Sequence, residues 1–533
     1  MQDFLDELDK ELWEDNSHLS NTQETNTQEI NTKEINTKEV KTWELKTKEV
    51  KKITTSRNIR VNKDNRRNKD SRTNKQGEVR WKFISKFPDV KFYLPTLREG
   101  YTRYMPIWGN NETWAKNMWM VQYDEDIILI DCWVQFADPD MLWVNYSIPD
   151  VSFLTKYKKN IKWFLITHAH LDHIWSLKHV MPALGMPTLY ATRFTMWIIK
   201  KSLDEAGLMP YANLIEVDAH SADKIKIGKF SVEYFNVNHS VPDCAWIYLE
   251  SEWWTKIVHT WDFKIDHTPA IDKPADLDRI EWIWKRDISL FLSDSTGSTR
   301  KGFSMSEKNV WEELEKIVSN HHRGRLIIAT FSSWISRVQQ LVNICEKYDK
   351  TIFLSGRSMV ENINIAKELW YLNIKDGIMK KMTPKNTEGI LPHKQVVITT
   401  GSQWEEFSAL SRMADWRHNS VEIVRWDTII FSSSIVPGNE KSVISIINRL
   451  IKLWANVITK DDGEVHTWGH AFQEEQKIFL DLIKPKYFMP IFWDLYFRTV
   501  HKNTAVDTGF REDNVLMLDN GNMVDFAPKN GRV

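Results

Sequence analysis

Cysteine is rare in this sequence, and long hydrophobic runs are absent. Cys132, Cys244 and Cys345 are scattered along 533 residues without a CxxC spacing. A disulfide-stabilised secreted protein is therefore not expected, and the thiols fit a reducing compartment. No apolar run approaches the ~20 residues that span a bilayer, and the acidic start has no signal-peptide pattern. We expect a cytoplasmic protein that does not enter a membrane.

Glycine is also scarce, while tryptophan is abundant. The sequence has 19 glycines and 26 tryptophans, although an average usage of about 7% predicts roughly 37 glycines. Trp370 and Trp454 follow helix-like stretches, at positions where a left-handed cap favours glycine. The indole of Trp175 would crowd the turn between a strand and a helix. We hypothesise that many of these tryptophans are encoded by UGA codons that the source organism decodes as glycine. The alternative is a tryptophan-rich protein with unusual aromatic packing.

The net charge of −1 conceals an uneven distribution. Residues 1–16 carry seven acidic groups against one lysine and have the pattern of a short amphipathic helix. This segment would suit docking to a protein partner, but a frayed tail is the favoured alternative. Residues 21–50 repeat a five-residue unit, a period that gives no continuous apolar face and predicts disorder. Residues 51–82 carry twelve Lys or Arg against three acids. Such an arm indicates either a polyanionic partner or a solvated linker.

Beyond this extension the sequence predicts alternating strands and helices. Apolar runs such as Ile127–Cys132 and Trp163–Thr167 predict buried strands. A regular succession of helix-like and strand-like segments follows, which is typical of an α/β domain with a parallel sheet. We predict an α/β protein with a disordered extension at 1–95, a first domain split between 96–305 and 461–533, and a second domain inserted at 306–460.

The segment Thr167–His173, of sequence THAHLDH, is the strongest chemical signal. It follows the apolar run Phe164–Ile166 and precedes a helix-like stretch that begins at Ile174. Three imidazoles and a carboxylate at a strand end can converge on metal ions, and zinc accepts both kinds of ligand at sites that keep an open position for water. The pattern predicts a dinuclear metal site, against the alternative of a solvated histidine-rich loop.

Further acidic or imidazole side chains follow four other strand-like runs, at Asp131, His239, Asp262 and Asp294. Any one of them alone is more often a turn or capping residue. Together with the histidine cluster they supply the roughly six or seven ligands that two metal ions need, including a carboxylate able to bridge. These residues favour a two-metal hydrolase.

Long stretches between about residues 100 and 525 resemble the ribonuclease J family, which belongs to the metallo-β-lactamase superfamily and carries an inserted β-CASP domain. The stretches include HAHLDH, NHSVPD, HTWDFKID, LSDST, SGRSMVENINIAKEL, TTGSQWE and WGHAFQEEQKIFLDLIKPKYFMP. The resemblance implies a metallo-β-lactamase αββα sandwich with a β-CASP insertion. The family pattern has glycine at nine of the tryptophans, namely Trp108, Trp133, Trp175, Trp261, Trp370, Trp404, Trp426, Trp454 and Trp493.

The resemblance also implies roles for individual side chains. It implies two zinc ions, with Mn²⁺ or Mg²⁺ as alternatives, and six ligands: His168, His170 and His239 on one ion, Asp172 and His173 on the other, and Asp262 as the bridge. His470 matches a β-CASP histidine that contacts the scissile phosphate and helps to protonate the leaving 3′-oxygen. Asp294 matches an acidic motif at the insertion boundary. Asp172, His470 and Asp294 are therefore the catalytic candidates.

Two groups of polar residues resemble substrate contacts: His466, Thr467, Trp468, Gly469 and His470 in one, and Ser355, Gly356, Arg357, Ser358 and Ser433 in the other. Small hydroxyls and backbone amides can bind phosphates, including a 5′-monophosphate end. A guanidinium such as that of Arg357 also binds phosphate. For any single serine, the alternative is a role in a turn or a helix cap. The implied function is a metal-dependent RNA hydrolase, a 5′→3′ exonuclease with endonuclease activity in RNA maturation and decay. Its partner would be single-stranded RNA with a 5′-monophosphate, and a homodimer is left open.

One position departs from the family pattern. Family members often have a further metal-binding histidine where this sequence has Phe492. A phenyl ring cannot ligate zinc, so we expect a weakened second site, completed by Asp494 or water. Two other functions therefore stay open: a different β-CASP endonuclease, and a catalytically weakened RNA-binding subunit.

Overall fold

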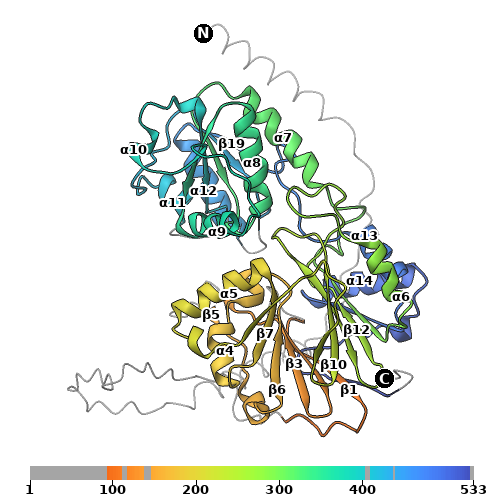
Figure 1. The fold of residues 1–533 in the computed structure, drawn as a ribbon. Helices are drawn as coiled ribbons and strands as arrows, with labels where there is room; N and C mark the ends of the chain where they lie inside the picture. Colours follow the sequence, from red (N-terminus) through yellow and green to blue (C-terminus); the bar gives the residue numbers. More distant parts are fainter. Residues whose placement is uncertain (1–92, 111–116, 137–145, 403–407, 436–438, 529–532) are drawn as a thin grey trace, which may run out of the picture. The chain divides into compact units, whose positions relative to one another are not determined.

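The computed structural model describes residues 93–533, except 111–116, 137–145, 403–407, 436–438 and 529–532. The acidic start, the repeats and the basic arm of the expected extension lie outside the described residues, as does Trp404. The described chain forms three large sheets and the helices that cover them (Figure 1). None of the helices in this part of the chain is long and apolar enough to cross a membrane.

The first sheet has seven strands, in the order β21 (Val524–Phe526), β1 (Thr102–Trp108), β2 (Met118–Tyr123), β3 (Asp126–Ile130), β6 (Ile161–Leu165), β7 (Thr188–Thr192) and β8 (Leu214–Val217). Along β3, Ile128 and Ile130 face the second sheet, while Ile127 and Leu129 pack with residues of α4 (Leu177–Ala183) and α5 (Arg193–Glu205). Successive side chains of a strand point to opposite faces, so a strand buried on both faces has the continuous apolar sequence seen here.

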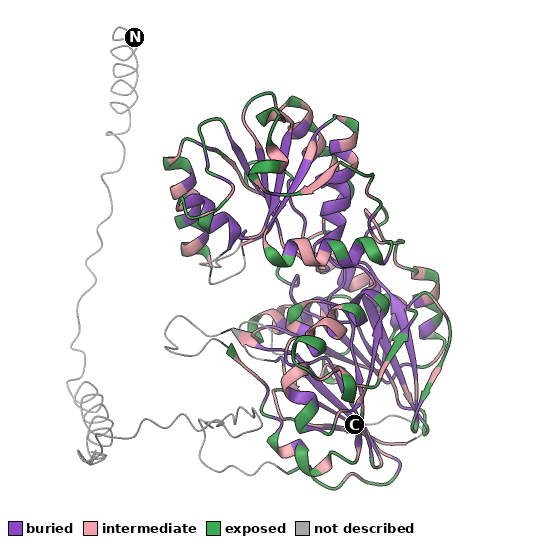
Figure 2. Ribbon diagram, turned by 60° about the vertical axis from the view of Figure 1, so that its left-hand side comes forward, coloured by how far each residue is buried: buried purple, intermediate pink, exposed green. Residues whose placement is uncertain are grey.

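The second sheet has six strands, in the order β20 (Tyr487–Ile491), β13 (Leu290–Asp294), β12 (Lys256–His259), β11 (Ala245–Ser251), β10 (Phe230–Asn236) and β9 (Ile225–Ile227). Its outer face packs on α6 (Leu277–Trp284), α13 (Gln473–Ile483) and α14 (Leu495–Asp507), around residues such as Trp246 and Phe479. The two sheets share one apolar core, and buried residues fill their facing sides (Figure 2). These two sheets and their outer helices are called the sandwich below.

The third sheet belongs to the segment Glu307–Ile458, called the insert below. Its strands lie in the order β16 (Met379–Lys381), β15 (Thr351–Ser355), β17 (Gln395–Thr399), β14 (Leu326–Ala329), β18 (Thr428–Phe431) and β19 (Asn456–Ile458). Every described pair is parallel, as the sequence predicts. One face packs on α7 (Glu307–Asn320), α8 (Ile335–Lys347) and α9 (Arg357–Glu368), and the other on α11 (Ala409–Ala414) and α12 (Glu440–Lys452); a short helix, α10 (Pro384–Thr387), follows β16.

The chain returns to the sandwich after the insert. Strand β20 pairs in parallel with β13, and β21 pairs with β1. Segments on both sides of the insert therefore build one structure.

The helix after the histidine cluster begins earlier than predicted. A short helix α3 spans Leu171–Ile174, with His170 in an extended conformation just before it. The sequence pattern predicts that the helix begins at Ile174, and this prediction is wrong. Asp172 in the first turn is a favourable residue at a helix N-terminus, because its carboxylate complements the helix dipole.

Several tryptophans have a backbone conformation that L residues rarely adopt. Fifteen described non-glycine residues have positive φ, and seven of them are tryptophans: Trp254, Trp261, Trp370, Trp416, Trp426, Trp454 and Trp493. Trp370 and Trp454 have φ of 66° and 63° just after α9 and α12, in agreement with the left-handed caps predicted there. Trp175 is different, since its φ is −66° and its ring stacks on Tyr146. The crowding predicted at Trp175 is therefore not observed.

Candidate metal centre

Strands of both sheets deliver the candidate ligands to one edge of the sandwich. β3 and β6 run parallel, and each ends just before one of these residues, Asp131 and His168 respectively. β10 and β12 are both antiparallel to β11 and therefore run in the same direction as each other. They end shortly before His239 and Asp262. The chain thus places ligands from distant parts of the sequence side by side.

The first group of ligands contains His168, His170, His239 and Asp262, whose ligand atoms all lie within 4.8 Å of one another. Nδ1 of His170 lies 3.1 Å from Nε2 of His168 and 3.1 Å from Nε2 of His239. Oδ2 of Asp262 lies 3.6 Å from Nε2 of His168 and 3.5 Å from Nε2 of His239. The four residues therefore face a common point.

The second group contains Asp172, His173 and Asp262. Nε2 of His173 lies 3.5 Å from Oδ2 of Asp172 and 3.6 Å from Oδ2 of Asp262. Asp262 belongs to both groups, as the bridging role requires. All six predicted ligands are thus brought together by the fold.

The residues present fit a divalent metal ion. Asp262 is buried, and its Oδ1 makes no hydrogen bond with any described residue. A buried carboxylate without compensation is costly, and ring nitrogens of several imidazoles point at one another instead of at ordinary partners. The nitrogen and oxygen donors are those that zinc and related ions accept.

Burial controls the protonation of the histidines. It lowers the pKa of His168 and His239 well below the usual value, and the neighbouring imidazoles lower both further. Both side chains are thus held as neutral imidazoles, the form that binds metals. His173 behaves oppositely: burial lowers its pKa, but Asp172 and Asp131 outweigh burial and raise it well above the usual value. A metal at His173 would therefore compete with a proton.

Asp131 orients His173, a role that the sequence analysis did not assign. Nδ1 of His173 donates to Oδ2 of Asp131 at 2.8 Å, which turns Nε2 toward the ligand group. The backbone N–H and the hydroxyl of Thr167 donate to the same carboxylate at 3.0 and 2.8 Å. Carboxylates that hold a ligating histidine from behind are a common feature of metal sites, and the position of Asp131 at a strand end is its one sequence signal.

The two other catalytic candidates contact each other beside the ligand groups. Nδ1 of His470 donates to Oδ2 of Asp294 at 2.8 Å and lies 3.9 Å from Oδ1 of Asp262. Burial lowers the pKa of His470, but Asp262 and Asp294 outweigh burial and raise it to about 9. At neutral pH this favours the protonated imidazole. The backbone carbonyl of Gly469, the residue before His470, accepts a hydrogen bond from Nδ1 of His239 at 2.6 Å. Position 469 has no room for a side chain, because a Cβ would lie 2.7 Å from the ring of His239.

The rest of the segment leading to His470 is packed in the same region. His466 and Thr467 are buried, and the ring of His466 lies against Trp334. The guanidinium carbon of Arg300 lies 3.8 Å from the ring centroid of Trp468. Arg300 carries no motif and was missed by the sequence analysis.

The second group of predicted substrate contacts lies in the insert, around a separate cavity of about 400 Å³. Ser355, Gly356 and Arg357 line this cavity, whereas Ser358 is exposed and Ser433 is buried two residues after β18. Four basic residues also line it, and sequence reasoning did not identify them: Lys381, Arg412, Arg417 and His418. Arg417 and His418 lie in an irregular loop, where no periodic pattern marks them.

Aromatic rings occupy the position of the absent family histidine. The ring of Phe492 packs against Trp261, with centroids 5.8 Å apart, and Trp261 packs edge-on against His173 at 4.8 Å. Asp494, expected as a substitute ligand, belongs to none of the ligand groups among the described residues; instead it precedes helix α14.

Two protein families match this chain. The metallo-beta-lactamase superfamily matches residues 112–252, and "Ribonuclease J, beta-CASP domain" matches residues 323–450. "Ribonuclease J 1" of Streptococcus pyogenes serotype M3 is 34% identical over 419 residues, which cover 79% of this chain and 73% of that protein. This chain belongs to the ribonuclease J family. Its fold is the metallo-β-lactamase sandwich with a β-CASP insert, as the sequence predicted.

Other members of the family differ in how much of their length is matched. Ribonuclease J of Mycoplasma genitalium is 32% identical over 78% of this chain and 72% of that protein. Ribonuclease J of Helicobacter pylori strain B128 is 36% identical over 79% of this chain, but the match spans only 60% of the length of that relative. A crystal structure of a protein of unknown function from Enterococcus faecalis V583 has the same fold, with a TM-score of 0.54, 13% identity and coverage of 80% of this chain and 100% of that one.

The hydrogen bond from His173 to Asp131 predicts an effect on metal affinity. Asp131→Asn removes the charge that holds the imidazole, so at alkaline pH, where no proton competes at His173 in either protein, the affinity for a divalent ion at the group containing His173 should fall about 10–100-fold. Competition against a chromophoric chelator measures this affinity. Asp126→Asn, at the opposite end of β3, is the matched control and should leave it unchanged. Equal affinities for the two variants would refute the role of Asp131.

Proposed function

We propose that this protein is a metal-dependent ribonuclease that hydrolyses RNA phosphodiester bonds, as a 5′→3′ exonuclease with endonuclease activity, in cytoplasmic RNA maturation and decay. The observation that carries the proposal is the pair of ligand groups that share Asp262, with His470 and Asp294 beside them. Membership of the ribonuclease J family supports RNA as the substrate.

The proposed cofactor is two zinc ions, with Mn²⁺ or Mg²⁺ as alternatives. His168, His170, His239 and Asp262 would hold one ion, and Asp172, His173 and Asp262 the other. When bound, the ions supply Lewis-acid stabilisation of the phosphate charge and activation of water. The second group offers three donors against four in the first, which supports a weaker second site.

His470 would supply the proton for the leaving 3′-oxygen. Its hydrogen bond to Asp294 fixes the ring and keeps it protonated, so the proton is in place before the bond breaks. A general acid of this kind contributes typically 10²–10⁴-fold to a rate. Asp294 itself is fully buried and acts through His470.

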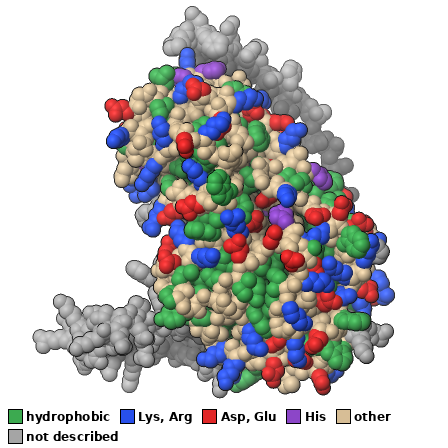
Figure 3. All heavy atoms as spheres, viewed as in Figure 1, with side chains coloured by type: hydrophobic (Ala, Val, Ile, Leu, Met, Phe, Trp, Pro, Cys, Tyr) green, Lys and Arg blue, Asp and Glu red, His purple; other side chains and the backbone are tan. Residues whose placement is uncertain are grey.

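The cavity in the insert would bind the 5′ end of the RNA. Gly356, with φ of 111°, stands at the N-terminus of helix α9, where backbone N–H groups and the helix dipole favour an anion. The guanidinium of Arg357 is largely exposed beside it and pairs with Glu361, and Lys381, Arg412 and Arg417 add positive charge to the cavity. On the face of the molecule in Figure 3, basic and acidic side chains are interspersed.

Sheet membership supports the proposed division of the chain. Strands from 96–305 and 461–533 form the two sheets of the metallo-β-lactamase domain, and strands from 306–460 form the β-CASP sheet. A homodimer and a protein partner for residues 1–16 remain proposals without support in the described part of the chain.

A weakened RNA-binding subunit is the second candidate function. It is favoured by Phe492 and Trp261, whose rings fill the space next to His173 where the family pattern has histidine and glycine. Metal binding without turnover would distinguish this function from the first.

We also propose that many of the tryptophans are glycine in the native protein, through decoding of UGA as glycine. Seven tryptophans at positive φ support this, because that conformation costs most residues roughly 1–2 kcal/mol and glycine almost nothing. Trp370 and Trp454 are 88% and 74% exposed, so burial of the rings gives little compensation. Glycine at 261 would also remove the ring that lies between Phe492 and His173.

The recoding can be tested on protein isolated from its own source. Peptide mass spectrometry should find glycine at positions 261, 370 and 454. Tryptophan at all three would contradict the proposal and would favour the weakened subunit.

The ribonuclease function can be tested with a metal-ligand variant. His170→Ala should reduce RNA cleavage to background, because His170 faces two other ligands of the first group. Its circular dichroism spectrum should stay unchanged. His220→Ala, which replaces an exposed histidine, is the matched control and should cleave normally. Unchanged cleavage by His170→Ala would refute the metal-site assignment.

The role of the insert cavity predicts a dependence on the 5′ end. Arg357→Ala removes a charged contact to phosphate, which is worth about tenfold or more in binding, so KM for 5′-monophosphorylated RNA should rise about tenfold. KM for 5′-hydroxyl RNA should change less than about twofold. Lys375→Ala, at an exposed lysine paired with Glu346, is the control. An equal rise for both RNAs would exclude recognition of the 5′ phosphate by Arg357.

A further inference from the structure

A buried network of charged groups lies where the chain passes between the sandwich and the insert. The chain enters the insert at Glu307 and leaves it after Ile458, on the way to His470. Arg337, on α8, is fully buried between these two passages. Neither the metal groups nor the insert cavity includes Arg337.

The guanidinium of Arg337 joins three segments that are distant in sequence. Its Nη2 donates to Oε2 of Glu307 at 3.0 Å, and its Nη1 donates to the hydroxyl of Ser432 and to the carbonyl of Val465, the latter at 2.8 Å. Its Nε donates to Gln340 at 2.8 Å, so each of its three nitrogens is engaged. The hydroxyl of Ser432 also donates to the carbonyl of Val465, at 2.7 Å. Arg337 therefore fixes the first residue of the insert and the return segment to the same point.

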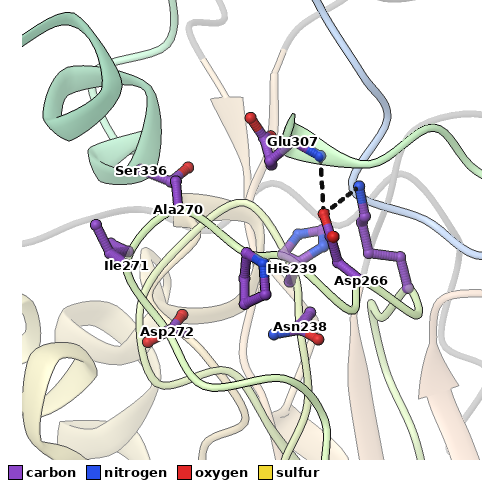
Figure 4. Close-up of a pocket in the computed structure, with 10 residues that line it drawn as sticks. Asn238, His239, Asp266, Ala270, Ile271, Asp272, Glu307 and Ser336 are labelled. Atoms are coloured by element: carbon purple, nitrogen blue, oxygen red, sulfur yellow. Dashed lines mark hydrogen bonds and ion pairs between the residues drawn. The ribbon is translucent and has the colours of Figure 1, made fainter. Parts of the chain in front are cut away.

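From Glu307 the network continues toward the metal ligands. The backbone N–H of Glu307 donates to Asp266 at 2.9 Å, and Asp266 pairs with Lys264 at 3.3 Å (Figure 4). Nζ of Lys264 donates to the carbonyl of Met305, and its backbone N–H donates to the carbonyl of Asn238 at 2.9 Å. Lys264 comes two residues after Asp262, and Asn238 directly precedes His239.

From Val465 the network continues toward His470. Two residues later, the hydroxyl of Thr467 donates to the carbonyl of Met305 at 2.5 Å. The same carbonyl also accepts from Lys264. The segment that carries His470 is therefore tied to the metal-bearing loops both through Met305 and through Arg337.

Buried ion pairs contribute little net stability compared with apolar residues of similar volume, but a hydrogen-bonded network selects one geometry. We propose that Arg337 is a positioning residue, which sets the place of His470 over the metal ligands by holding Glu307 and Val465 together. This inference rests on the proposed ribonuclease function. It assigns the alignment of the proton donor to a side chain in the insert that contacts neither substrate nor metal.

Two substrates separate positioning from simple loss of folded protein. RNA has a poor leaving group that needs a proton, whereas bis(p-nitrophenyl) phosphate releases p-nitrophenolate without one. Arg337→Lys keeps the charge but cannot span three partners, so kcat for RNA should fall at least about tenfold. The rate with the small diester should stay within about twofold. A parallel fall for both substrates, or no fall for either, would overturn the inference.

Hydrogen exchange gives a second readout that does not depend on activity. In Arg337→Lys and Arg337→Met, amides of residues 463–470 should exchange at least about tenfold faster than in the unaltered protein. Amides of β14 should not change. Arg325→Met is the matched control, because Arg325 also pairs with a buried carboxylate, that of Asp427, but within the insert; it should leave residues 463–470 protected.

The two readouts distinguish the two proposals. If the unaltered protein cleaves no RNA, the proposed function fails, while the exchange of residues 463–470 still decides whether Arg337 holds that segment. Unchanged exchange there in folded Arg337→Lys would refute the inference whatever the activity. Should Arg337→Met fail to fold, the lysine variant alone decides.

Discussion

One buried carboxylate, that of Asp262, determines the arrangement of the site. It belongs to both ligand groups described above, and it forms a third possible ligand group with Asp294 and His470. Its Oδ2 is 3.5 to 3.6 Å from three imidazoles. A buried negative charge is tolerated only when positive or metal-bound partners surround it. The strand ends of both sheets, the turn at α3 and the return segment after the insert all supply groups that meet this requirement.

The candidate ligand residues could be recognised in the sequence because their signals are local, whereas their division between two ions came from the family resemblance. The cluster His168–His173 follows an apolar run directly, and Asp262 and Asp294 stand at or just after the ends of buried strands. Parallel strands buried on both faces also have nearly continuous apolar sequences, which made the sheet of the insert recognisable. The residue types and the strand positions together were enough to predict that these side chains gather at one place, as they do in the fold.

The supporting contacts could not be predicted, because they join residues with no shared pattern. Arg337 meets Ser432 and Val465 across 95 and 128 residues, and neither partner stands in a periodic position relative to it. The basic residues Arg412 and Arg417 reach the insert cavity from a helix and an irregular loop. Trp175 was misjudged for a different reason, since Tyr146 offers a stacking partner that only tertiary structure brings near.

The pairing of β20 with β13 has a consequence for synthesis on the ribosome. β13 ends at Asp294 and β20 begins at Tyr487, so the nascent sandwich has an open edge until the whole insert has been translated. At about 5–20 residues per second this interval lasts roughly 10–40 s. The insert, whose strands are contiguous in sequence, can fold during that time. Exposed edges pair readily with other chains, so the edge of β13 is open to wrong pairing during this interval.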